Sequence, residues 1–310
     1  MGHSLAEGIL YPRWAPDFYH GYGYPIFNYY APLTYYLGYW ISLGQPEFAA
    51  EAAKVLFVGA HMMGILSAYQ LGKTFGARGG GLLGATAFAF SPYIQFINPH
   101  VRGGLAEVFA LGCLPWVLWS WHNVWQGAGF KFSVLAVISA AATLLSHNLT
   151  GLMMLGLVGG LSAWHLLIRG HRASLRNALL AGVVFVLLTA FFWLPFLLER
   201  QYIQLEDVTG KGHYDYRQHF VSLPELLKLL PQQDYRASAP IAPMTIGPQI
   251  LVLAIVGLSI SQKVAFKTKQ NLAMNLRSDM MFFGISALFC IWLTQRSSAW
   301  IWGNIPGLIY

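Results

Sequence analysis

Three ionisable side chains stand close together near the start of the chain, in a segment rich in aromatic residues. Arg13, Asp17 and His20 lie within residues 11–32, where four prolines and two glycines prevent a regular helix. A guanidinium can bind a phosphate through two parallel hydrogen bonds, and a nearby carboxylate can act as a general base or metal ligand. The segment therefore predicts either a loop that handles anions or an interfacial loop in which Arg13 and Asp17 simply pair.

A second pair of opposite charges occurs in the sequence NPHVRGGLAE (98–107). Arg102 and Glu107 lie five residues apart, at the edge of an apolar run. Ionisable groups at such depth are costly and usually face a bundle interior or a wet cavity. Two glycines between them allow a backbone or a lipid headgroup to approach closely. The alternative is an ion pair that holds two helices together.

Polar residues also interrupt the uncharged run 132–168, which is too long for one membrane crossing. Ser146, His147 and Asn148 stand near its middle and predict two helices joined by a tight turn. His147 and Asn148 are then candidates for binding a substrate, although a lone histidine at a turn is often structural. The triplet 148–150 matches a glycosylation acceptor, but a tight turn at the membrane argues against that use.

Other chemistry has weaker support in this sequence. Several acids and histidines in the long polar segment 199–245 lack the compact spacing of metal ligands, so we interpret them as solvent-exposed charges and not as a metal site. These residues are Glu206, Asp207, His213, Asp215 and His219. His61, His122 and His165 fall in or beside apolar runs and are interpreted as packing or interfacial residues. No G-x-S-x-G, P-loop, H-E-x-x-H or C-x-x-C pattern is present.

Composition indicates an integral membrane protein. Hydrophobic residues make up 56% of the chain and charged residues 10%, against about 25% charged in typical soluble domains. Short basic connections stay on the cytoplasmic side of a membrane, and this accounts for the net charge of +7 without nucleic-acid binding. Ten of the nineteen Lys and Arg residues occur in four such breaks: Lys73, Arg78, Lys131, Arg169, Arg172, Arg176, Lys263, Lys267, Lys269 and Arg277.

The apolar runs between these breaks predict an all-α, polytopic transmembrane bundle with an external face. Residues 1–46 form an external loop with an interfacial helix at 33–44, and 47–198 form a six-span bundle. Residues 199–245 form a second external loop that includes a short amphipathic helix, and 246–310 contain the last spans. The eight predicted spans are 50–73, 79–97, 104–124, 132–146, 149–168, 177–198, 246–262 and 279–295.

Several stretches resemble a family of bacterial multi-spanning membrane proteins. They are PRWAPD (12–17), GYGYPIFNYYAP (21–32), VRGGLAE (101–107) and the Pro115-Trp116 pair. The family is labelled "6-pyruvoyl-tetrahydropterin synthase-related", although nothing in this chain looks like that soluble zinc enzyme. Its members are distantly similar to the GT-C glycosyltransferases, which use polyprenyl-phosphate sugars as donors. By this resemblance the chain is a fragment that lacks a preceding membrane helix and a C-terminal remainder.

The resemblance implies roles for particular residues at the external face of a bacterial inner membrane. Asp17 takes the position of the acidic catalytic residue, which deprotonates the acceptor or binds a divalent metal. Arg13 or Arg102 would hold the donor phosphate, and Glu107 would orient Arg102 or serve as a second carboxylate. His20, His147 and Asn148 complete the expected substrate contacts.

Two other functions remain open at this point. A lipid or polymer transporter would place charged groups near the bilayer midplane of several helices, often in repeated halves; the predicted spans have almost no central charge and no half-repeat. A non-catalytic membrane scaffold would make every charged pair structural.

Overall fold

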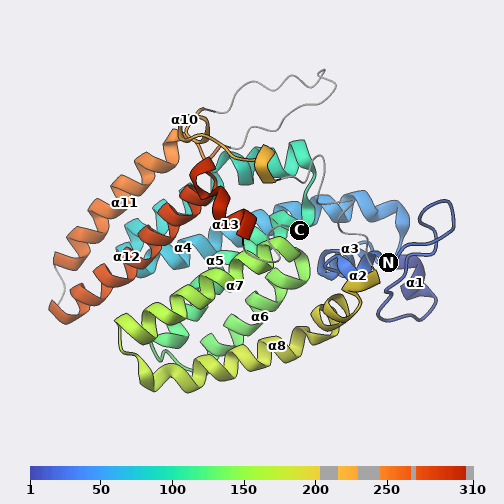
Figure 1. Ribbon diagram of the computed structural model, residues 1–310, viewed down its shortest axis with the longest axis horizontal. Coiled ribbons are helices and arrows are strands. Elements are labelled where there is room, and N and C mark those ends of the chain that lie inside the picture. Colours follow the sequence, from blue (N-terminus) through green and yellow to red (C-terminus); the bar gives the residue numbers. More distant parts are fainter. Residues whose placement is uncertain (203–215, 230–244, 267–269, 305–310) are drawn as a thin grey trace.

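The computed structural model describes residues 1–202, 216–229, 245–266 and 270–304 (Figure 1). Within these ranges the chain forms helices, and its strand-like pairing is limited to one isolated bridge between Ala15 and Tyr24. The predicted all-α class is therefore confirmed for the part of the chain that is described.

Among the described residues, five helical segments are long and apolar enough to cross a membrane. At most 28% of the most apolar window of each is buried inside the protein, so most of these apolar side chains face outward. Such a surface is stable in lipid and costly in water. The chain is thus a multi-pass membrane protein whose surroundings are a lipid bilayer. The segments are Pro46–Arg102, Asn148–Ile168, Arg172–Leu198, Pro248–Phe266 and Ala273–Leu293.

The first of these segments folds back on itself. Helix α4 (Ala49–Ala89) has 41 residues, or about 60 Å of helix, which is twice a bilayer core. Non-helical torsions at Gly76 and Ala77 break it, and Ala77 has a φ of 49°. Gly72 and Gly80 then lie backbone to backbone, since a Cβ on Gly72 would come within 2.3 Å of the Gly80 carbonyl oxygen. Two antiparallel arms result.

These two arms only partly match the predicted spans 50–73 and 79–97. The second arm ends at Ala89, and the chain continues as a π-helix, η2 (Tyr93–Arg102), which contains Pro99. Proline removes a backbone donor and disturbs α-helical pairing, so the wider π turn replaces a straight helix here. Gly103, at a φ of 63°, ends η2 before the next helix.

Helix α5 (Leu105–Trp125) is the centre of the bundle and packs against α4 and three later helices. These are α6 (Phe130–Ser146), α7 (Asn148–Ala163) and α8 (Leu175–Leu198). The predicted break between α6 and α7 is confirmed, because His147 takes the extended torsions φ −149° and ψ 117°. The buried core includes Val117, Trp121, Ala140, Met154 and Leu161.

The last long helices are α11 (Pro248–Phe266), which packs against α4, and α12 (Gln270–Leu293). The fourth basic break was predicted as a loop, and this is wrong for most of its length. Lys263 lies in the last turn of α11, and Arg277 lies well inside α12. A helix can continue through this run because long basic side chains such as Lys263 and Arg277 can extend along it towards the membrane surface.

The remaining elements are short. Helix α3 (Leu33–Ile41) lies within the predicted interfacial helix at 33–44. Of the predicted amphipathic helix in the long loop, the described residues show α10 (Leu223–Leu226), capped by Ser222 and Glu225. The others are α1 (Gly2–Ala6), α2 (Ile26–Tyr29), η1 (Pro46–Phe48), the π-helix η3 (Trp164–Ile168), η4 (Arg172–Ser174), η5 (Arg200–Tyr202), η7 (Tyr216–Gln218), η8 (Arg296–Ser298) and α13 (Ala299–Asn304).

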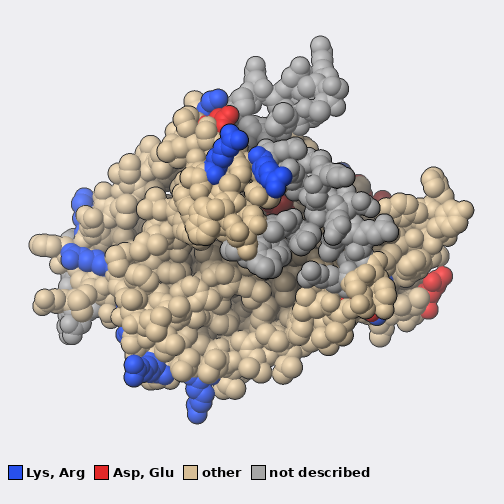
Figure 2. Space-filling view, viewed as in Figure 1, with Lys and Arg blue, Asp and Glu red and all other residues tan. Residues whose placement is uncertain are grey.

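The two ends of the bundle differ in character. Helices α1, α2 and α3 gather at one end, called the outer end below, while the last turns of α7 and α11 lie at the other, called the basic end (Figure 1). Figure 2 shows Lys and Arg side chains around the basic end, with a further group beside α10. The orientation predicted from the sequence would place the basic end in the cytoplasm.

Candidate functional site

A compact group of polar side chains lies at the outer end, where η2 meets α5. Arg102 Nη1 donates to Glu107 Oε2 at 2.7 Å, and the Tyr93 hydroxyl donates to Glu107 Oε1 at 2.6 Å. Arg102 also contacts the Tyr93 hydroxyl and reaches Asn98 Oδ1 at 3.5 Å. The π-helix brings Tyr93 and Asn98, five residues apart, to one side. These four residues are called the Arg102 cluster below.

His147 and Tyr30 stand beside this cluster. Burial lowers the pKa of His147, while Glu107 raises it and Arg102 lowers it further. Burial raises the pKa of Tyr30, and the charge of Glu107 adds to that effect against the opposing charge of Arg102. Both side chains therefore lie in the electrostatic field of the same carboxylate and guanidinium. The imidazole also caps α7, because His147 Nδ1 accepts the Thr150 backbone N–H at 3.3 Å.

Two amides in this region have a buried atom without a partner among the described residues. Asn98 is fully buried and its Nδ2 is unpaired. Asn148 donates from Nδ2 to the Tyr29 carbonyl at 2.6 Å, and its Oδ1 is unpaired. A buried polar atom left without a partner costs roughly 1–3 kcal/mol. Both amides are thus positioned to bind water or a polar ligand beside the charged pair.

A second charged group lies next to the first and ties the N-terminal segment to the end of α8. Arg13 Nε donates to Asn28 Oδ1 at 2.6 Å, and its guanidinium pairs with Glu199. Asn28 Nδ2 donates to the other Glu199 oxygen at 2.5 Å, and Tyr29 donates to the Glu199 carbonyl at 3.2 Å. The hydrogen bond from Arg13, followed by that from Asn28, lowers the pKa of Glu199. The alternative in which Arg13 pairs with Asp17 is therefore wrong.

The two groups are linked through consecutive tyrosines. Tyr29 bonds to Glu199 on one side and to Asn148 on the other, and Tyr30 faces the Arg102–Glu107 pair. Of the seven predicted site residues, the structure brings together Arg102, Glu107, His147 and Asn148, with Arg13 one step away. Two residues of the second charged group, Asn28 and Glu199, were not among the predicted site residues.

Asp17 and His20 lie apart from this arrangement. Both side chains are exposed, and His20 has a left-handed φ of 59°. Burial lowers the pKa of the Met1 amino group and Asp17 opposes that shift, so Asp17 lies near the start of the chain. In the described residues neither side chain bonds to the Arg102 cluster.

Glu199 was missed because its partners are distant in sequence, whereas Asn28 and Tyr93 were missed because their contacts depend on how irregular segments fold. Arg13 and Glu199 are 186 residues apart, and no local spacing predicts such a contact. One available signal was that Glu199 directly follows a long apolar run. Of the five residues weighed as a loop metal site, Glu206, Asp207, His213 and Asp215 lie outside the described residues, and His219 is exposed.

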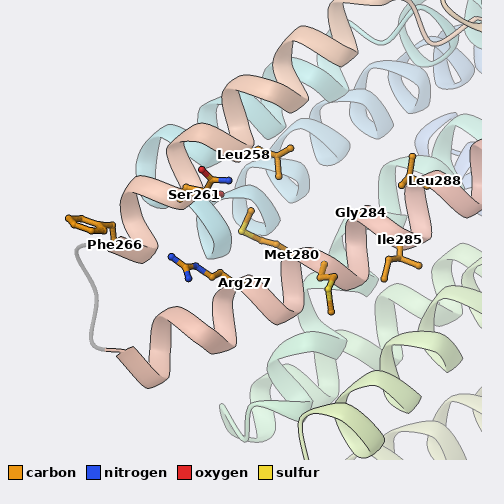
Figure 3. Close-up of a pocket in the computed structure, with 10 residues that line it drawn as sticks. Leu258, Ser261, Phe266, Arg277, Met280, Gly284, Ile285 and Leu288 are labelled. Carbon is orange, nitrogen blue, oxygen red and sulfur yellow. The ribbon is translucent and has the colours of Figure 1, made fainter.

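An open groove of about 640 Å³ lies between α11 and α12 (Figure 3). Its lining is largely apolar and includes Leu258, Met280, Ile285 and Leu288, with Arg277 near the basic end. Such a surface between outward-facing helices suits lipid contact and carries no group of catalytic side chains. The outer end therefore remains the better candidate for chemistry.

Comparison with known proteins finds no matching family model, and no significant match among curated proteins or solved structures. The fold defines the chain as a polytopic helical membrane protein. Its site is defined here by its own residues, the Arg102 cluster with His147, Tyr30 and Asn148.

Proposed function

We propose that this protein is a membrane glycosyltransferase that moves a sugar from a polyprenyl-phosphate donor at the extracytoplasmic face of a bacterial inner membrane. The observation that carries the proposal is the Arg102–Glu107 pair, held between η2 and α5 beside His147 and two amides with unpaired buried atoms. Sugar transfer from such a donor needs a cation for the departing phosphate and a carboxylate for the acceptor proton. Both are present within one group.

The proposed roles follow from these contacts. Arg102 neutralises the phosphate as negative charge develops on it in the transition state. Glu107, whose side chain is 16% exposed, accepts the proton of the attacking hydroxyl. The amides of Asn148 and Asn98 bind sugar hydroxyls, while His147 borders the acceptor. Arg13 keeps the first loop against α8 through Glu199.

Asp17, the acid that the resemblance favours, has a less suitable setting. It is exposed, and the described residues place no group of three metal-ligating side chains around it. The described surroundings of Asp17 therefore do not supply the ligand set of a metal ion. Glu107 becomes the first candidate for the base and Asp17 the second.

Transfer of a radiolabelled sugar from a polyprenyl-phosphate donor tests the proposal in membranes that contain the full-length protein. We expect Glu107→Gln to lower the rate at least about 100-fold, the lower range of general-base effects, because glutamine keeps the shape but accepts no proton. Asp17→Asn serves as the matched acid-to-amide control and should retain activity. If the two variants show the reverse pattern, the base is Asp17; if wild type transfers no sugar, the function is wrong.

One observation favours a non-catalytic scaffold instead. Both arginines already have carboxylate partners, Glu107 for Arg102 and Glu199 for Arg13, so neither needs a ligand to balance its charge. A scaffold would show no transfer with any variant and would lose stability when either pair is broken. The transporter interpretation gains no support from these two ion pairs, because both lie at the outer end of the described helices.

A further inference from the structure

We propose that the basic end of the bundle binds one divalent transition-metal ion of the zinc class, held by His122, His165 and Asp279. The three residues come from α5, η3 and α12, and one potential ligand atom from each lies within 4.8 Å of the others. This place is separate from the Arg102 cluster at the outer end. The inference does not depend on the proposed sugar transfer.

Burial of these three side chains is the first reason. His165 is 0% exposed, and His122 and Asp279 are each 3% exposed. A carboxylate and two imidazoles removed from water are expensive unless they are paired or coordinate a metal. Imidazole nitrogen together with carboxylate oxygen is also a ligand set that suits Zn²⁺ and similar ions.

The separation of the two imidazoles is the second reason. His122 Nδ1 and His165 Nε2 are 3.3 Å apart. Two ligands bound at about 2.0–2.1 Å to a tetrahedral zinc ion stand about 3.3–3.4 Å apart. The two nitrogens therefore already have the spacing of adjacent ligands, and a modest movement of Asp279 supplies the third.

The outer contacts of each ligand are the third reason. The other nitrogen of His165, Nδ1, lies 3.2 Å from His171 Nδ1 and can donate its proton there. The other nitrogen of His122, Nε2, lies 3.5 Å from the Gln126 side-chain amide, which must turn its oxygen toward the ring to accept the Nε2 proton. Asp279 Oδ1 accepts from Arg169 at 3.1 Å. Metal-binding histidines characteristically use their second nitrogen in such a contact, which fixes the ring.

Arg169 sets a limit on affinity. It is 4% exposed, donates to the Asn275 carbonyl at 2.6 Å and has one nitrogen, Nη2, without a partner among the described residues. Its positive charge opposes entry of a dication, and Asp279 offsets only part of that repulsion. We therefore expect exchangeable binding. Since α12 packs mainly against α11, the ion would join α12 to the core helix α5.

The experiment is metal titration of the purified full-length protein in detergent, first stripped with a chelator. We expect about one equivalent of Zn²⁺ per chain, and Co²⁺ in its place should give the visible absorption bands of a tetrahedral site. His165→Gln and Asp279→Asn should each weaken binding at least about tenfold. The matched control is His100→Gln, which removes an exposed histidine and should leave binding unchanged.

Thermal unfolding is a second measurement, and it does not depend on variants that fold poorly. Zn²⁺ should raise the thermal midpoint of the wild-type protein and of His100→Gln, because an ion that binds the native state stabilises it, and a chelator should reverse the rise. Absence of stoichiometric Zn²⁺ and Co²⁺ binding by monodisperse wild type overturns the proposal and leaves a hydrogen-bonded histidine chain. Equal loss of binding in the His100 variant overturns it as well, since surface histidines would then be the ligands.

Discussion

At the scale of single residues, the two outer ion pairs are held differently. In the Arg13–Glu199 pair both side chains are at least a third exposed, 42% and 34%, whereas Glu107 in the other pair is 16% exposed. Exposed ion pairs contribute little, about 0–1 kcal/mol, and their geometry is easily lost. The two arginines are about equally exposed, at 40% and 42%, so the pairs differ in their carboxylates, and Glu107 is the more protected from water.

His147 has a structural task that can be separated from any binding role. Its Nδ1 accepts from the Thr150 N–H and faces the Thr150 hydroxyl at 2.9 Å. We expect His147→Ala to lower the free energy of unfolding by about 1 kcal/mol through loss of this cap, and His147→Asn to retain most of it because asparagine is a good N-cap. Reversible unfolding in mixed detergent measures both.

Unfolding measured at several pH values tests the role of His147 in a second way. The folded-state pKa of His147 is lowered, mainly by burial, so this residue stabilises the fold above its ordinary pKa of about 6.5. That contribution should fall as the pH drops below 6.5, and the fall should be absent in His147→Asn. An identical pH profile in the variant would show that another group is responsible.

Loss of sugar transfer in a stable His147→Asn protein would indicate a direct substrate contact.

Residue types in the sequence revealed part of the site and no more. Arg102, Glu107 and His147 could be selected because charged and polar groups are rare in apolar runs. Their mutual contacts could not be derived, since they depend on how α5, η2 and the α6–α7 turn pack. His122 and His165 were interpreted as packing residues, because their sequence distance hides the contact between the two rings.

At the scale of elements, helix positions were largely predictable and their irregularities were not. The length of the run 132–168 required two helices, and three polar residues marked the break now seen at His147. By contrast, the π-helix η2 replaced the end of a predicted span, because Pro99 and the contacts of Tyr93 and Asn98 favour a wider turn. The extension of α11 and α12 into the basic break was also unexpected, since positive charge there resembled a loop.

The α4 hairpin depends on close contact between its arms. A Cβ on Gly84 would lie 2.6 Å from the Ala68 carbonyl oxygen, a distance that requires the arms to separate. We expect Gly84→Ala to destabilise the protein by about 1–3 kcal/mol, the usual range for overpacking. Gly59→Ala on the first arm meets no atom within 4 Å and should be neutral or slightly stabilising. Thermal unfolding in detergent compares them, and equal midpoints would contradict the close contact.

At the scale of the whole molecule, the proposal depends on which end faces the cytoplasm. We expect a cysteine at Arg172, on the connection after α7, to react with a membrane-impermeant maleimide only after the membrane is opened. A cysteine at the exposed Asp17 should react in intact cells. Both are made in a chain whose native Cys113 and Cys290 are replaced. The opposite labelling pattern would place the Arg102 cluster in the cytoplasm and remove the proposed extracytoplasmic reaction.

The unequal lengths of two neighbouring helices have a consequence for the surrounding lipid. Helix α6 has 17 residues and α8 has 24, or about 26 Å and 36 Å of helix. A bilayer core of about 30 Å is too thick for the first and thinner than the second. If Lys131 keeps the start of α6 at the membrane surface, the His147 turn lies several ångströms below the opposite headgroups. Phospholipids bordering that side would have to tilt or compress, and the proposed lipid-phosphate donor would then reach Arg102 by descending into this depression rather than by binding at the water interface.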